Sequence, residues 1–92
     1  MLSFLPKTPN EIQQNLKTNF KQKRKKLGFT QNDLANRSGV SLGSLKRFEN
    51  SGQISLESLL KLALVLECLE EFDCLCGDKG EEFGSIEEII LS

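Results

Sequence analysis

The chain of 92 residues contains no histidine, and this absence excludes a large part of enzyme chemistry. Without an imidazole there is no histidine general base, no Ser–His or Cys–His pair and no histidine-containing zinc site. The glycines also form no loop of the kind that cradles a phosphate. We therefore expect a protein that is not an enzyme and that carries no cofactor.

Cysteine is scarce and unevenly placed, because Cys68, Cys74 and Cys76 all lie in one short segment. An odd, clustered set does not make a disulfide framework, so a reducing cytosol is the expected setting. Buried cysteine usually packs as a small hydrophobe, and we expect no metal site. A metal held with an outside ligand stays an alternative.

Long hydrophobic runs are also missing, since no stretch of about 18 apolar residues occurs and no membrane-spanning helix is expected. The first 25 residues are polar and basic, which favours a cytoplasmic protein without a signal peptide. A chain of 92 residues forms one small domain with a marginal core, so oligomerisation is a fair expectation.

The net charge of −1 hides a division of the chain into a basic front and an acidic back. Residues 1–61 hold 11 Lys/Arg and 4 Asp/Glu, which is +7, whereas residues 62–92 hold 1 and 9, which is −8. The basic part favours nucleic-acid binding. The acidic tail, residues 77–92, either binds a basic partner or only aids solubility.

Helix caps and apolar spacing predict an all-α fold of five helices, preceded by a flexible arm over residues 1–8. Thr8 and Glu11 form a capping box around Pro9. The predicted helices cover residues 9–26, 31–38, 42–50, 56–66 and 69–76. A second capping-box sequence at 85–88 predicts a short C-terminal extra element, either a helical turn or a strand.

The segment 31–50, QNDLANRSGVSLGSLKRFEN, has the pattern of a helix-turn-helix, which places its second helix in the major groove of DNA. The apolar residues spaced to fill the wedge between the two helices are Leu34, Val40, Leu45 and Phe48. Ala35 is small where the helices pass close together, and Gly39 lies where the turn requires a left-handed backbone.

These features resemble the Cro/CI-type helix-turn-helix domain, also called the XRE family, from about Leu16 to Leu75. The matching residues are Arg24, Gly28, Thr30, Gln31, Leu34, Ala35, Gly39, Val40, Ser41, Leu45, Phe48, Glu49 and Asn50. The resemblance implies a five-helix, lambda-repressor-like DNA-binding domain over residues 9–76. It also implies phosphate contacts by Gln31 and Asn50, and an ion pair between Arg24 and Glu49.

The candidate DNA-binding residues are Gln31, Ser41, Leu42, Gly43, Ser44, Lys46, Arg47 and Asn50. Arg47 is the best candidate for base reading, because its fork matches the two acceptors of guanine in the major groove. Ser44 suits a base or a phosphate, and Leu42 a thymine methyl. Gly43 departs from the longer polar residue of many relatives and allows close approach of the backbone to DNA. The alternative is an ordinary solvated helix face.

The basic run from Lys21 to Lys26 has two interpretations, a contact with the DNA backbone or favourable charge at a helix C-terminus.

Residues 59–69 contain nine apolar residues out of eleven, more than one amphipathic stripe requires. We expect a two-fold dimer interface formed by Leu62, Leu64, Val65 and Leu69. The alternative is a helix buried wholly within one domain.

The segment 41–72, SLGSLKRFENSGQISLESLLKLALVLECLEEF, resembles the corresponding part of HipB-like proteins, which are the antitoxin subunits encoded beside HipA-type kinases. That resemblance implies a homodimeric repressor of its own operon, acting on a palindromic operator. It also implies a HipA-like kinase toxin as partner, with or without a third subunit. The alternatives are a stand-alone phage-type repressor and a protein-binding module with weak DNA affinity.

Overall fold

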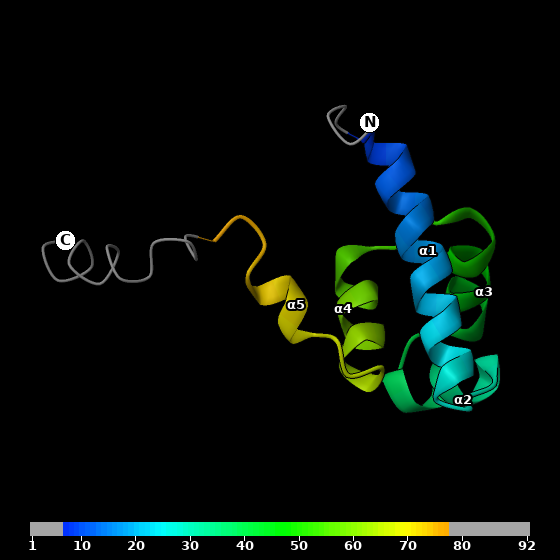
Figure 1. Cartoon of the computed structure of the whole chain (residues 1–92). Helices are drawn as coiled ribbons and strands as arrows, with labels where there is room; N and C mark the ends of the chain where they lie inside the picture. Colours follow the sequence, from blue (N-terminus) through cyan, green and yellow to red (C-terminus); the bar gives the residue numbers. More distant parts are fainter. Residues whose placement is uncertain (1–6, 78–92) are drawn as a thin grey trace, which may run out of the picture.

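The computed structural model describes residues 7–77, and within this range it contains five helices and no strand. They are α1 (Pro9–Lys26), α2 (Gln31–Ser38), α3 (Leu42–Ser51), α4 (Leu56–Val65) and α5 (Glu70–Asp73) (Figure 1). The predicted all-α, five-helix fold is confirmed over this range. The expected extra element near Ser85, the first six residues of the arm and nearly all of the acidic tail lie outside the described residues.

Local capping starts four of the five helices at the predicted residues. The Thr8 hydroxyl accepts from the Glu11 N–H at 3.1 Å, and the Glu11 carboxylate accepts from the Thr8 N–H at 3.2 Å. A second capping box joins Thr30 and Asp33, and single serine caps start α3 and α4. Each cap satisfies N–H groups that have no partner within the helix.

The fifth helix is shorter than predicted, because α5 ends at Asp73 instead of continuing to Cys76. No side-chain cap starts this helix, and Cys76 adopts a positive φ of 59°. Four residues without a cap form only about one turn, which gains little from helical hydrogen bonds alone. The helix therefore depends on packing by Phe72, which lies against the core.

The core lies between α1, α2, α3 and α4, with α1 against α3 and α2 against both α3 and α4 (Figure 1). Its buried apolar residues are Phe20, Leu34, Ala35, Val40, Leu45, Phe48, Leu59, Leu62, Ala63 and Leu66. The Phe20 and Phe48 rings meet edge to face with centroids 5.6 Å apart. Burying each large apolar side chain contributes about 1.5–3 kcal/mol, and eight of these ten residues are large, which is a substantial core for this chain length.

The apolar residues of α1 are buried toward the C-terminal end of the helix only. Phe20 is buried and Leu16 packs partly against the core, whereas Ile12 is 44% exposed. The first turn of α1 is thus exposed to solvent. None of the described helices is long and apolar enough to cross a membrane.

Candidate nucleic-acid interface

The turn between α2 and α3 has the geometry that the sequence predicts. Gly39 adopts the left-handed conformation with φ of 79°, and its N–H donates to the Ala35 carbonyl at 3.0 Å. Leu34, Val40 and Leu45 are buried inside the wedge between the two helices. The turn and these side chains together orient α3 against α2.

A buried ion pair connects α3 to α1. The Arg24 Nε donates to Glu49 Oε2 at 2.7 Å, and its Nη2 donates to Oε1 at 3.0 Å. The two side chains are only 8% and 4% exposed. Gln31 Nε2 also donates to Glu49 Oε1 at 2.9 Å, so the carboxylate joins α1, α2 and α3. This bidentate pair fixes the orientation of α3 relative to α1, because breaking it would leave a buried charge without its partner.

The outer face of α3 is polar and open to solvent. Leu45 and Phe48, each 1% exposed, hold the inner face, which leaves Gly43, Lys46 and Arg47 exposed outside. Asn50, also exposed, ends this face near the C-terminus of the helix. Leu42 is half-buried against the core, so only part of its side chain is available to DNA.

Two serines shape the start of α3. The Ser41 hydroxyl accepts from the Ser44 N–H at 3.1 Å and donates to the Ser44 hydroxyl oxygen at 2.9 Å. Ser41 is therefore committed to capping, whereas the Ser44 hydroxyl keeps its own hydrogen to donate. Of these two predicted contacts, Ser44 is the better suited to DNA.

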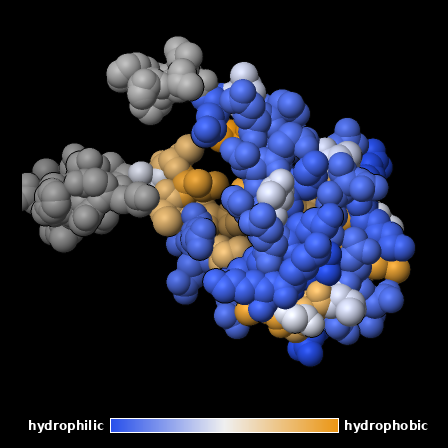
Figure 2. Space-filling model, turned by 45° about the vertical axis from the view of Figure 1, so that its right-hand side comes forward, coloured by the Kyte–Doolittle hydropathy of each residue, from blue (hydrophilic) through white to orange (hydrophobic). Residues whose placement is uncertain are grey.

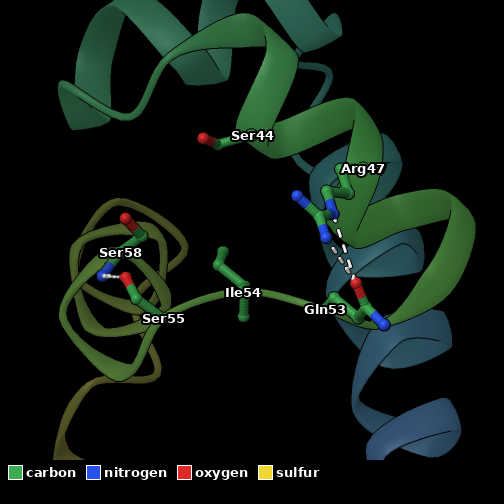
Figure 3. Close-up of a pocket in the computed structure, with 6 residues that line it drawn as sticks. All are labelled: Ser44, Arg47, Gln53, Ile54, Ser55 and Ser58. Carbon is green, nitrogen blue, oxygen red and sulfur yellow. Dashed lines mark hydrogen bonds between the residues drawn. The ribbon is translucent and has the colours of Figure 1, made fainter.

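A hollow of about 320 Å³ lies between the outer face of α3 and the start of α4 (Figure 3). Its lining residues are Ser44, Arg47, Gln53, Ile54, Ser55 and Ser58. Arg47 and Gln53 form one side, and the Ser55 cap of α4 forms the other. The Ser55 hydroxyl already accepts from the Ser58 N–H at 3.1 Å, whereas the Arg47 guanidinium places a positive charge on the other side of the hollow. The hollow therefore combines one positive side chain with several hydroxyl groups next to the outer face of α3.

Several contacts around the C-terminal end of α3 were not expected from the sequence. Gln13 Nε2 donates to the Gly52 carbonyl at 2.7 Å, and Gln14 Nε2 donates to the Ser51 carbonyl at 3.0 Å. Gln53 Oε1 accepts from Arg47 Nε at 3.2 Å and from Nη2 at 2.7 Å. Residues 51–53 lie between two predicted helices, and no sequence pattern relates them to glutamines nearly forty residues away.

The four residues expected at a dimer interface do not share one surface. Leu62 is fully buried, at 0% exposed, and packs in the core of its own protomer, so its assignment to the interface is corrected. Leu64 is 64% exposed, and Val65 and Leu69 are half-buried. The reason is that α4 turns Leu62 inward against the core, whereas Leu64 lies about 200° further around the helix.

The basic end of α1 faces in more than one direction. Lys23 lines an apolar groove of about 410 Å³ together with Cys68, Glu71 and Phe72. Lys25 and Lys26 are exposed. In Figure 2 the visible surface is mostly hydrophilic, with hydrophobic residues gathered where the described chain ends. Lys23 therefore lies in this groove, beside Cys68 and Phe72, and does not extend the outer face of α3.

Two side chains have shifted pKa values. The backbone and hydroxyl hydrogen bonds of Thr30 lower the pKa of the Asp33 carboxyl. Burial, followed by the nearby Glu71 carboxylate, raises the pKa of the Cys68 thiol. Among residues 7–77, no three cysteine or carboxylate side chains are grouped to hold a metal ion. The pKa shifts thus reflect a helix cap and a partly buried thiol, and neither lies on the outer face of α3.

Comparison with known proteins agrees with this geometry. The family described as Helix-turn-helix, HTH_3, matches residues 20–71, which is more than half of the chain and includes α2, the turn and α3. No curated protein and no solved structure is a significant match. The chain therefore belongs to the HTH_3, XRE-type helix-turn-helix family, and it is a DNA-binding transcriptional regulator.

Proposed function

We propose that the protein is a sequence-specific repressor that binds a palindromic operator as a homodimer. The observation that carries this proposal is the division of α3 into two faces. Leu45, Phe48 and Glu49 hold one face inside the protomer, and Arg47 lies exposed on the other. A helix held in this way can enter the major groove as a rigid unit, with a side chain suited to guanine.

The dimer is supported by apolar surface on α4 and beyond it. Leu64 is among the most exposed large apolar side chains of the described chain, and Val65 and Leu69 are only partly covered. A second copy that covers these residues would remove apolar area from water, at about 25 cal/mol per Å². The proposed interface therefore consists of Leu64, Val65 and Leu69, without Leu62.

The finer proposal is that the protein is the autoregulating antitoxin subunit of an operon that encodes a HipA-type kinase. The sequence resemblance over residues 41–72 supports it. The native host offers a direct test, in which the tagged protein is purified and its partners are identified by mass spectrometry. Recovery of the kinase encoded in the same operon supports the antitoxin role, whereas its absence under operon-expressing conditions leaves a stand-alone repressor.

DNA binding itself is tested by a salt titration with fluorescence anisotropy on operator and scrambled duplexes. A DNA-binding protein loses affinity with a log–log slope of about −0.9 per neutralised phosphate. Arg47→Ala, compared with the wild type, is expected to lose about 1–3 kcal/mol on the operator and less on scrambled DNA. An equal loss on both duplexes contradicts base reading by Arg47.

A second candidate function is that of a protein-binding module with little DNA affinity. Gly43 favours it, because this position on the outer face carries no side chain that could read a base. In the same titration, a flat response to salt, or no binding, supports the module and contradicts the repressor.

A further inference from the structure

The guanidinium of the exposed Arg47 is held by Gln53, a glutamine that lies just after the end of α3. Gln53 Oε1 accepts from Arg47 Nε at 3.2 Å and from Arg47 Nη2 at 2.7 Å (Figure 3). An arginine has five N–H donors in a rigid plane, and this oxygen occupies the edge formed by Nε and Nη2. The end of the guanidinium, with one N–H from each terminal nitrogen, stays free.

The backbone that carries Gln53 is itself held in place. The Ser51 hydroxyl donates to the Arg47 carbonyl at 2.7 Å and accepts from the Gln53 N–H at 3.2 Å. The Gln53 side chain then returns to the Arg47 guanidinium, which closes a ring of hydrogen bonds. This ring fixes the direction from which Gln53 approaches Arg47.

The turn is also fastened to α1. Gln13 and Gln14 donate to the carbonyls of Gly52 and Ser51. Gly52 is buried, with φ of 85°, and a Cβ at this position would lie 3.0 Å from Gln14 Nε2. The turn is therefore held between two helices by bonds that do not involve the exposed outer face.

We infer that Gln53 is a positioning residue that commits Arg47 to an end-on approach to guanine. The free end of the guanidinium presents the two parallel donors that match O6 and N7 of this base. A guanidinium that Gln53 holds in this orientation before binding would lose less side-chain entropy on binding than an unrestrained one. This inference rests on the proposed function, since it requires Arg47 to read a base.

The test compares wild type, Gln53→Met, Gln53→Glu and Arg47→Ala on duplexes that differ only at the guanine whose preference Arg47→Ala relaxes. Gln53→Met keeps the side-chain length and removes the acceptor, and we expect it to lower the guanine preference by about three- to tenfold. Gln53→Glu keeps the acceptor. Its negative charge is expected to weaken binding to every duplex by repelling the phosphates, while the preference for guanine is retained.

A second measurement uses the free protein, where the Arg47 Nε–H proton is followed by ¹⁵N NMR. Exchange of this proton with water is expected to be slower in wild type and Gln53→Glu than in Gln53→Met. If Gln53→Met keeps the wild-type preference for guanine, or loses affinity equally on every duplex, the inference is overturned but the proposed function is not. If Arg47→Ala leaves base preference unchanged, base reading by Arg47 is wrong and the inference falls with it.

Discussion

A substitution at Gly43 is expected to change stability and DNA affinity in opposite directions, because nothing in the free protein requires a glycine there. A Cβ built at Gly43 meets no heavy atom within 4 Å, and the residue lies in the first turn of α3 without a positive φ. Gly43→Ala should therefore stabilise the protein by about 0.5–1 kcal/mol, by reducing the backbone entropy of the unfolded chain. This corresponds to a rise in Tm of roughly 2–8 °C for a domain of this size.

On DNA the same methyl group is expected to act in the opposite direction. If the α3 backbone approaches the groove closely at Gly43, the added carbon must displace DNA contacts. We expect about a tenfold weaker operator affinity, equivalent to about 1.4 kcal/mol. The assays are thermal unfolding by circular dichroism at fixed protein concentration, and anisotropy titration of the operator.

Gly39→Ala is the matched control, since a Cβ there also meets nothing within 4 Å but φ is 79°. It should destabilise the protein by about 1–2 kcal/mol, because an alanine is strained in the left-handed region. Both positions have open space for a Cβ. If Gly43→Ala raises the stability and Gly39→Ala lowers it, the loss at Gly39 is due to backbone strain and not to crowding. A more stable Gly43→Ala protein with unchanged operator affinity refutes the close approach of α3 to DNA.

Three further outcomes are expected. Arg24→Met should cost about 3–5 kcal/mol in chemical unfolding because it strands the Glu49 carboxylate, and Arg24→Met/Glu49→Met should cost less; a larger cost for the double variant contradicts the buried pair. Leu64→Glu should shift the protein toward monomer in light scattering, and an unchanged dimer places the interface elsewhere. Iodoacetamide should modify Cys68 more slowly than the exposed Cys74 in peptide mapping, since Cys68 has a raised pKa and is partly buried; faster modification of Cys68 contradicts its environment.

The features that sequence predicted well depend on residues close together in the chain. Thr8, Thr30, Ser41 and Ser55 each bond a backbone N–H three residues ahead, so the sequence alone places the helix starts. The wedge of the helix-turn-helix is also local, since its residues span less than twenty positions. Gly39 adopts the expected left-handed turn for the same reason.

The features that only tertiary structure decided depend on how helices face one another. The apolar residues of α4 are too many to show from the sequence which of them is covered. Leu62 and Leu64 were therefore both expected at the interface, although one is 0% and the other 64% exposed. The Gln13 bond to Gly52 spans 39 positions, and it exists because α1 crosses the end of α3. Local hydrogen bonds fix where helices begin and place Gln53 beside Arg47, whereas the packing of α1 against α3 decides which polar groups far apart in the chain meet.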